Sequence, residues 1–357
     1  MTSGPVNRQQ RRAAAKKSGR SAVDEFNAGA AAMAEGRLDL AEAHLRRSLV
    51  LKQTRQAHHN LGSVLTDRGA AAEAVGHFRQ ALRHSPADSR HHNSLVKPLQ
   101  LLGRRAEAIA SGTRTLILKD AEAVGAWRGT APAAGDPLAD SGRHRDVVAF
   151  SLWGDVPLYV RGAIENAAQI PRLLPGWICR VYHDDSVPRD SLSELAGLGA
   201  ELMAMPPHRE TGLGLFWRFG AAVDPSVRRF LCRDADSRPS PRETAAVEAW
   251  VASGRDFHIV RDELLHCEVM LAGLWGGKAG LLPDLPERAA RWQAANPHRM
   301  NARVEDQRFL RFQVWPLARD RALIHDSIYR VLGSVDFPAD APHPAGEHVG
   351  MRHQPIG

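Results

Sequence analysis

The chain has 357 residues, of which 43% are hydrophobic, and it carries a net charge of +7. Its length suits two or three globular domains, and no stretch approaches the ~18 consecutive apolar residues of a transmembrane helix. Six basic residues and no acidic residue fall within residues 1–20, so the excess charge indicates a basic arm rather than a nucleic-acid-binding face. The three cysteines are far apart and form no CxxC pair, which favours a reducing compartment and a cytoplasmic protein.

A repeat of 33 to 34 residues marks the N-terminal part of the chain. A glycine recurs at that period and an alanine follows each one five residues later: Gly36, Gly69 and Gly103, then Ala41, Ala74 and Ala108. Residues 22–120 therefore resemble tetratricopeptide repeats, most clearly in the middle copy, "NLGSVLTDRGAAAEAVGHFRQALRHSPAD". The third copy is degenerate, with Pro98 in its first helix and Gly112 where the middle copy has Phe78.

Helical repeats of this kind present a concave surface to partners. They indicate either capture of a protein partner or self-association, and we expect no specific nucleic-acid partner. The segments outside the folded parts have their own compositions. Residues 1–21 predict a disordered basic arm, residues 121–145, rich in Gly, Pro and Ala, predict a linker, and residues 336–357, rich in Pro, Gly and His, predict a flexible tail.

Residues 146–335 alternate between strand and helix patterns. The expected strands are 147–154, 178–185, 200–206, 228–237 and 257–260, and the expected helices are 160–170, 191–199 and 241–254. This alternation is typical of an α/β domain with a mostly parallel sheet, so the fold class of the whole chain is expected to be α + α/β. Ligands of such sheets bind outside the carboxyl ends of the strands.

Phosphate-binding glycine loops are missing from this domain. The sequence has neither GxGxxG nor GxxxxGK[ST], so any affinity for phosphate must come from a metal ion and from arginines. The segment "RRFLCRDADSRPS" (228–240) offers a metal site, because an apolar strand runs into Asp234 and Asp236. Carboxylates two residues apart can converge on one divalent cation, which takes its other ligands from water and phosphate. An acidic surface turn is the alternative reading.

Several short motifs appear in a familiar order around this segment. They are "FSLWG" (150–154), "HDD" (183–185), "GLFWRF" (214–219), "RDADS" (233–237), "GLWGGKAG" (273–280), "EDQRFL" (305–310) and "LIHDS" (323–327). Residues 146–335 thereby resemble a GT-A-fold glycosyltransferase domain of the DxD type, and the chain is similar to bacterial proteins that join tetratricopeptide repeats to such a domain. The resemblance implies a Rossmann-like sheet and transfer of a sugar from a nucleotide-diphosphate sugar to a protein, glycan or lipid acceptor.

The resemblance also implies roles for single residues. Asp234 and Asp236 would bind Mn²⁺ or Mg²⁺ and the donor diphosphate. His325 would be a third metal ligand or a phosphate contact, although a structural histidine explains it equally well. Arg233 is a further expected donor contact. Asp306 would be the inverting base or an acid that binds the acceptor or sugar, although acids at a helix start are also favoured by the helix dipole.

The nucleotide pocket is expected at the ends of the first two strands. Trp153 and Gly154 would line it, and either Asp184 or Asp185 would lie near the base or ribose. Arg218 would pair with phosphate, since its guanidinium donates two parallel hydrogen bonds. The glycines of "GLWGG" would let the backbone approach the donor sugar and acceptor.

Two other functions compete with a metal-dependent glycosyltransferase. The chain could be a non-catalytic repeat protein whose α/β domain binds a nucleotide sugar without turnover. A metal-dependent phosphohydrolase is the third reading, and it suffers from the lack of a clustered set of His and Asp ligands. The sequence leaves open the donor, the acceptor and whether the reaction retains or inverts configuration.

Overall fold

The computed structural model describes residues 21–129, 144–207, 211–300, 304–344 and 346–352. The chain divides into two compact units, Met1–Leu118 and Lys119–Gly357, and the division falls within helix α7 (Arg105–Ala126). No helix within the described ranges is long and apolar enough to cross a membrane. The predicted basic arm lies outside the described residues apart from Ser21, which caps the first described helix.

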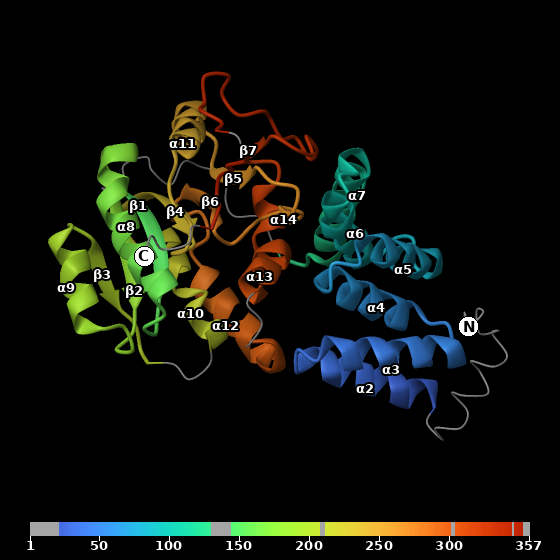
Figure 1. Cartoon of the computed structure of the whole chain (residues 1–357). Helices are drawn as coiled ribbons and strands as arrows, with labels where there is room; N and C mark the ends of the chain where they lie inside the picture. Colours follow the sequence, from blue (N-terminus) through green and yellow to red (C-terminus); the bar gives the residue numbers. More distant parts are fainter. Residues whose placement is uncertain (1–20, 130–143, 208–210, 301–303, 345, 353–357) are drawn as a thin grey trace. The chain divides into compact units, whose positions relative to one another are not determined.

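The first unit consists of helix pairs, as the repeat predicted (Figure 1). Helix α2 (Ala22–Ala34) pairs with α3 (Leu38–Leu51) and α4 (Arg55–Asp67) with α5 (Ala71–His84), and α6 (Ser89–Leu101) is followed by α7. Gly36, Gly69 and Gly103 lie in the turns within the pairs, with φ of +70°, +80° and +69°. Side chains with β carbons rarely adopt this conformation, which explains the period of the glycines.

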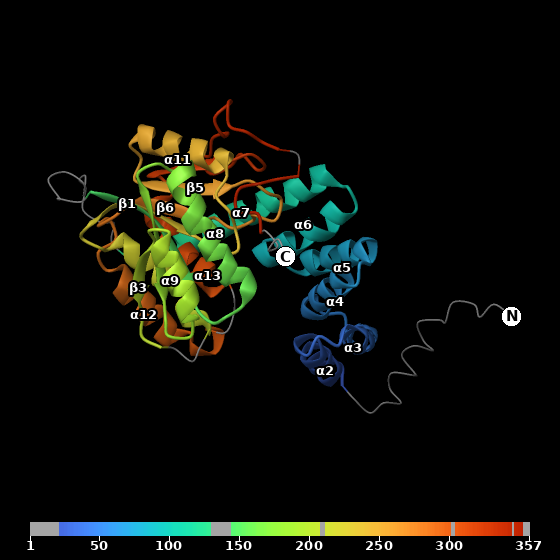
Figure 2. The same ribbon diagram turned by 60° about the vertical axis from the view of Figure 1, so that its left-hand side comes forward.

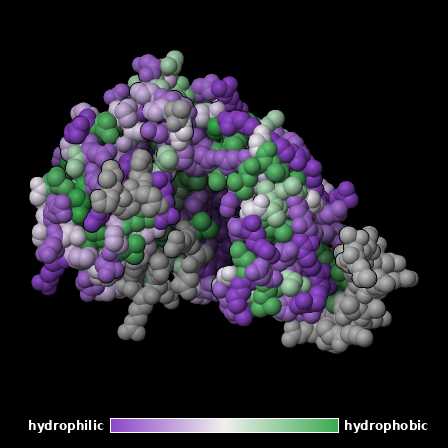
Figure 3. All heavy atoms as spheres, viewed as in Figure 1, coloured by the Kyte–Doolittle hydropathy of each residue, from purple (hydrophilic) through white to green (hydrophobic). Residues whose placement is uncertain are grey.

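Small residues allow the paired helices to pack closely. A β carbon on Gly29 would lie 2.8 Å from Leu45, and one on Gly62 would lie 2.8 Å from the ring of Phe78. Ala41 and Ala74 are fully buried at the same crossings. Over the face of the molecule in Figure 3, hydrophobic residues are scattered among hydrophilic ones, as is usual for a surface whose large apolar side chains lie inside.

The second unit is built on a seven-stranded sheet with the order β3-β2-β1-β4-β6-β5-β7. Its strands are β1 (Arg145–Leu152), β2 (Trp177–His183), β3 (Glu201–Ala204), β4 (Val227–Arg233), β5 (Phe257–Arg261), β6 (Leu274–Lys278) and β7 (Ala322–Asp326). Only β6 runs antiparallel to its neighbours in this sheet. The α + α/β class and the mostly parallel sheet are therefore confirmed.

Helices cover both faces of the sheet (Figure 2). On one face, α8 (Pro157–Leu173), α9 (Arg189–Gly197) and α11 (Pro241–Ser253) share an apolar core with alternate residues of β1 and β2 and with Leu231 of β4. On the other face, Phe219 of the 3-10 helix η1 (Trp217–Ala222) packs against Trp275 of β6, and Phe309 of α13 (Glu305–Gln313) stacks on Phe219. The remaining short helices are α10 (Thr211–Gly214), α12 (Leu285–Ala295), η2 (Pro297–Arg299) and α14 (Trp315–Ala318).

The strand order places a switch of direction between β1 and β4. From β1 the chain moves outward to β2 and β3, and it then returns to place β4 on the other side of β1. The connections after β1 and β4 lead toward opposite edges of the sheet, and folds of this kind bind ligands in the crevice expected outside the carboxyl ends of two such strands.

The structure corrects two boundary expectations. The expected linker 121–145 begins inside α7, and its residues 130–143 lie outside the described part of the chain. Within the second unit, the last turns of α7 are held by Lys119, which contacts Glu268 at 3.0 Å, and by Asp120, which accepts a hydrogen bond from Trp315 at 2.8 Å. These polar contacts stabilise the last turns of α7, which extend into the expected linker as far as Ala126. Most of the glycines and prolines of that linker follow Ala126 in the sequence.

The tail expected to be flexible is packed in its described part. Phe337 and Val349 are buried, and the amide of Val349 donates to Asp262 at 3.0 Å. Phe337 stacks under the guanidinium of Arg242 at 3.9 Å. The few apolar residues of this Pro- and Gly-rich segment anchor it to the domain. Because they are few, the composition of the segment predicts a flexible tail and does not predict this packing.

Two glycine-to-alanine substitutions, one at a helix crossing and one on the surface, test the packing of the repeats. Gly62→Ala should lower the free energy of unfolding by about 1–3 kcal/mol, because its β carbon meets the buried ring of Phe78. Gly76→Ala, on an exposed position of α5 with nothing within 4 Å, should raise it by about 0.5–1 kcal/mol through helix propensity. Urea unfolding followed by circular dichroism measures both. Equal effects of the two substitutions would contradict the proposed crossing.

Candidate functional site

The two acids of "RDADS" lie on a tight turn rather than on the strand. Strand β4 ends at Arg233, and the turn closes when the amide and hydroxyl of Ser237 donate to the carbonyl of Asp234 at 3.1 and 2.9 Å. The side chain of Asp234 is 54% exposed, while that of Asp236 is 20% exposed. The sequence pattern thus places both carboxylates directly after a buried strand, at the crevice beside β1.

Close packing from beneath fixes this turn. A β carbon on Gly162 of α8 would lie 2.1 Å from the carbonyl oxygen of Ala235, so only glycine fits there. Arg238 donates to the carbonyls of Ala235 and Ser237 at 3.0 and 2.9 Å, and its Nε pairs with Glu165 at 2.5 Å. The backbone of the acidic turn is therefore bonded on the α8 side, which directs the Asp234 side chain toward solvent.

Arg218 connects the turn to the rest of the site. Its guanidinium is buried and donates to Asp234 at 2.6 Å, to the carbonyl of Arg233 at 2.9 Å and to Asp306 at 2.9 Å. Its amide donates to the hydroxyl of Ser151 on β1 at 3.1 Å. One arginine thus joins β1, the turn after β4 and α13.

Burial and charge shift the pKa values of this group. Burial raises the pKa of Asp306 to about 6, although the adjacent Arg218 acts to lower it. Burial also raises the pKa of Asp236, and the negative charge of Asp234 raises it further, while Arg352 opposes both. Burial lowers the pKa of Arg218, but Asp234 and Asp306 outweigh it and the net shift is upward. The site therefore concentrates negative charge around one buried cation.

The loops after β1 and β2 bring together most of the expected nucleotide-pocket residues. The amide of Gly154, whose φ is +71°, donates to the hydroxyl of Ser186 at 2.7 Å. Asp184 is buried and accepts from the amide of Ser186 at 3.1 Å, whereas Asp185 is exposed. Sequence reasoning missed Ser186, although a serine two residues after a strand-end aspartate is a signal for such a turn.

The ring of Trp153 lies beside the crevice. It meets Trp217 of η1 edge to face, with ring centroids 6.0 Å apart. The neighbouring aromatic residues Phe216 and Phe219 are buried and contribute to the core. Trp153 and Trp217 are only partly buried. Trp153 directly precedes Gly154, in the loop after β1.

Two of the predicted site residues lie elsewhere. Arg233 is buried, and its guanidinium contacts Glu243 and donates to the carbonyls of Cys232 and Trp275. Side chains alternate along a strand, so Arg233 points to the α11 face of the sheet, whereas Arg218 lies on the opposite face.

His325 lies on β7, three strands from β4, which at the usual strand spacing is roughly 14 Å away. Its Nδ1 is 3.1 Å from His258, and its ring contacts Phe337. Burial lowers the pKa of His325 to about 4, which suits a neutral structural histidine. The structure does not bring it to Asp234 and Asp236.

The packed tail supplies a residue that the sequence did not indicate. Arg352 forms a bridge with the backbone of Ser237, and its guanidinium lies 3.2 Å from a carboxylate oxygen of Asp236. The contact spans more than a hundred residues of sequence, and no pattern in the tail predicts it. Each acid of the turn therefore has an arginine beside it, Arg218 for Asp234 and Arg352 for Asp236.

The glycines of "GLWGG" serve packing in this structure. A β carbon on Gly273 would lie 2.1 Å from Oδ2 of Asp234, so this glycine lets the backbone approach the acidic turn. Gly276 and Gly277 are on β6, where a β carbon would meet the carbonyl of Phe230 at 2.3 Å and the ring of Phe257 at 2.8 Å. Only Gly273 of the three is next to the candidate site.

A metal ion fits this site only with few protein ligands. No group of three or more His, Cys, Asp or Glu residues that could hold a metal exists among the described residues. Asp234 and Asp236 remain as two nearby carboxylates, and burial, together with the negative charge of Asp234, raises the pKa of Asp236. Hard divalent cations are commonly held by one or two carboxylates, with water and phosphate oxygens completing the shell. The carboxylates of Asp234 and Asp236 are a ligand set of this kind.

Comparisons with known proteins give little beyond this geometry. No protein-family model matches the chain, and no curated protein matches it. A solved structure of a mutant O-GlcNAc transferase from Thermobaculum terrenum matches with a TM-score of 0.29 and 16% identity, over 65% of this chain and 47% of that one. The chain spans about half the length of that protein, and a likeness at this level carries no argument about function.

The two close-packed glycines should respond differently to alanine. Gly276→Ala should lower the free energy of unfolding by about 1–3 kcal/mol or more, because its new methyl group meets backbone in the middle of the sheet. Gly273→Ala should cost less than about 1 kcal/mol, since the exposed Asp234 carboxylate can turn away into water. Denaturant unfolding of both variants measures these two changes in the free energy of unfolding. An equally large loss for Gly273→Ala would show that the Asp234 side chain is held rigidly.

Proposed function

We propose that the unit Lys119–Gly357 is a metal-dependent glycosyltransferase domain of the GT-A type, preceded by tetratricopeptide repeats. It would move a sugar from a nucleotide-diphosphate sugar to a protein, glycan or lipid acceptor. The observation that carries the proposal is the acidic turn Asp234–Ser237 at the carboxyl end of β4, at the switch of strand order and bonded to the buried Arg218. The strand order, with one antiparallel strand in a mostly parallel sheet, also supports it.

The charges of the site explain why this proposal includes a cation. A diphosphate is repelled by two carboxylates unless a positive ion lies between them. Asp234 and Asp236 would hold Mn²⁺ or Mg²⁺, which when bound offsets the charge that develops on the departing diphosphate. Arg352 lies on Asp236 in this structure, so it would have to move from that carboxylate.

The remaining residues would bind and orient the donor. Trp153 and Gly154, with Asp184 or the exposed Asp185, border the crevice on the β1 and β2 side and would contact the nucleoside. Arg218 already uses two of its nitrogens on Asp234 and Asp306, so it would set the position of the acidic turn more than it would bind phosphate. Asp306 is the candidate base, because a pKa of about 6 suits proton removal near neutral pH.

A binding domain without turnover is the alternative, and two contacts favour it. Asp306 is buried and bonded to Arg218, and Asp236 is paired with Arg352. A chain with these contacts could bind a nucleotide sugar and present a partner on its repeats without transferring the sugar. Donor binding without hydrolysis or transfer to any acceptor would favour this alternative.

Titration calorimetry tests the metal and donor sites. UDP and GDP should bind in the presence of Mn²⁺, and Asp234→Ala or Asp236→Ala should weaken that binding by about tenfold or more, because a charge-assisted ligand is lost. Asp320→Ala, at a residue whose side chain is 87% exposed, removes the same charge elsewhere and is the control. Arg352→Ala should tighten Mn²⁺ binding, since it removes the competing cation from Asp236. Absence of heat with every nucleoside diphosphate would overturn the proposal.

The role of Asp306 is tested by pH. A base must be deprotonated, so kcat/KM for transfer or donor hydrolysis should rise with pH through about 6 and level off above it. Asp306→Asn keeps the shape of the side chain but removes this limb of the profile and should lower kcat by about a hundredfold or more. A variant with unchanged kcat and a raised KM would make Asp306 a positioning residue that acts through Arg218.

A further inference from the structure

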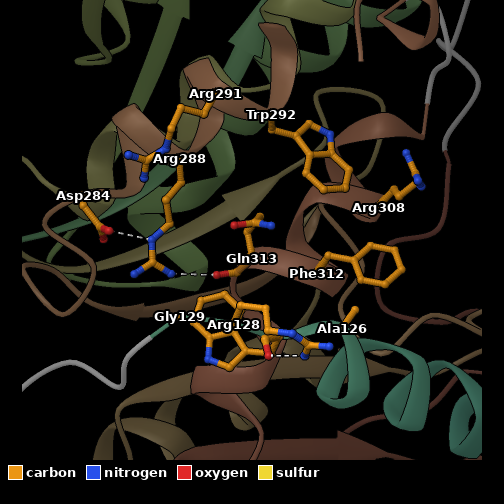
Figure 4. A pocket seen from close by; sticks show the side chains of 11 residues that line it. Ala126, Arg128, Gly129, Asp284, Arg288, Arg291, Trp292, Arg308, Phe312 and Gln313 are labelled. Carbon is orange, nitrogen blue, oxygen red and sulfur yellow. Dashed lines mark hydrogen bonds and ion pairs between the residues drawn. The ribbon is translucent and has the colours of Figure 1, made fainter. Parts of the chain in front are cut away.

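A cavity whose lining does not include the acidic turn lies in the same unit. It has a volume of about 540 Å³ and is bordered by the end of α7 with the segment Trp127–Gly129, by α12 and by α13 (Figure 4). This volume is within the range of pockets that hold small ligands. Its lining includes none of the residues Asp234, Asp236 and Arg218, so it is a separate site.

The lining is strongly basic. Four arginines border the cavity against one carboxylate, that of Asp284: Arg128, Arg288, Arg291 and Arg308. Arg288 is largely committed, because it pairs with Asp284 at 2.8 Å and donates to the carbonyl of Gln313 at 3.0 Å. The other three arginines have donors to spare.

Those three arginines differ in the hydrogen bonds and ion pairs that their side chains make. The side chain of Arg291 is exposed and makes no hydrogen bond or ion pair with another described residue. Among the described residues, Arg128 donates only to the backbone carbonyls of Gly125 and Trp127, so no described carboxylate balances its charge. Arg308 uses a single nitrogen for both the carboxylate of Glu305 at 3.2 Å and the side chain of Asn296 at 3.3 Å. Guanidinium groups with unused donors at one cavity attract an anion.

Aromatic rings form the rest of the wall. Trp292 and Phe312 are stacked with ring centroids 6.1 Å apart, and the guanidinium of Arg308 lies 5.1 Å from the centroid of Trp292. Arg288 lies 5.3 Å from the ring of Trp127. A guanidinium stacked on a ring keeps its in-plane N–H groups available, so it can bind an anion while the ring packs against an apolar or planar surface.

We propose that this pocket binds a small molecule in which a phosphate group is attached to a ring, as in a sugar phosphate or a nucleoside monophosphate. Arg291, Arg308 and Arg128 bind the phosphate, and Trp292 and Trp127 pack against the ring. The pocket needs no metal ion, because its own charge is positive. The inference does not depend on the proposed glycosyltransferase activity.

Calorimetry in the presence of EDTA tests this proposal on the full chain. Glucose 1-phosphate and uridine monophosphate should bind, and uncharged methyl glucoside should not. Arg291→Ala removes an exposed, unpaired side chain, so the fold is expected to survive, and it should weaken phosphate binding by about tenfold or more. Arg172→Ala, an exposed arginine on α8, removes the same charge outside the pocket and should change nothing.

Further arms separate this site from the acidic turn and identify the ring. Asp234→Ala should leave the metal-free binding unchanged, and Trp292→Ala should weaken binding of the ester but not of inorganic phosphate. Tighter binding of uridine monophosphate assigns the pocket to nucleotides, and tighter binding of glucose 1-phosphate assigns it to sugar phosphates. Absence of binding by both esters, or an equal loss with Arg172→Ala, would overturn the proposal. An Asp234→Ala variant that abolishes the binding would place the ester in the acidic crevice and would overturn it as well.

Discussion

The candidate site depends on one buried guanidinium. Arg218 is 3% exposed, and a buried charge is tolerated only when it is paired and hydrogen-bonded. The partners of its guanidinium come from two parts of the sequence: the carbonyl of Arg233 with Asp234 at the end of β4, and Asp306 at the start of α13. Removing Asp306, the buried one of the two carboxylates, leaves a buried N–H group of Arg218 without its acceptor, which costs about 1–3 kcal/mol. The cation therefore fixes the acidic turn and α13 relative to each other.

The same cluster has more negative than positive charge. The carboxylates of Asp234, Asp236 and Asp306 lie around one fully buried cation, the guanidinium of Arg218. Arg352, in the C-terminal tail, reaches Asp236, and the side chain of Arg352 is 55% exposed. The raised pKa values of Asp236 and Asp306 reflect this imbalance together with burial. A divalent ion at the turn would relieve it, whereas an anion alone would increase it. This electrostatic argument, and not the acidic motif alone, is what favours a metal with the donor.

Local patterns predicted the elements, and contacts between distant segments decided the rest. The glycine period located the helix turns, because each of those glycines needs a positive φ. The apolar runs located β1 to β5, yet β6 was read as a ligand loop, since Gly276 and Gly277 are there to let neighbouring strands approach. Sequence order favours His325 as a ligand because it cannot show that two strands, β6 and β5, lie between β4 and β7 in the sheet. The pairing of Arg218 with Asp306, 88 residues later, also leaves no local trace.

Helix α13 separates two environments of opposite charge. Asp306 faces inward to Arg218, and Arg308 and Phe312, which lie roughly 200–240° further around the helix at 100° per residue, border the basic cavity. A phosphate that approaches the acidic turn must come with a cation, whereas one that enters the cavity meets unbalanced arginines directly. Asp306 and Arg308 are two residues apart on α13, so a single helix supplies a residue to each of the two environments.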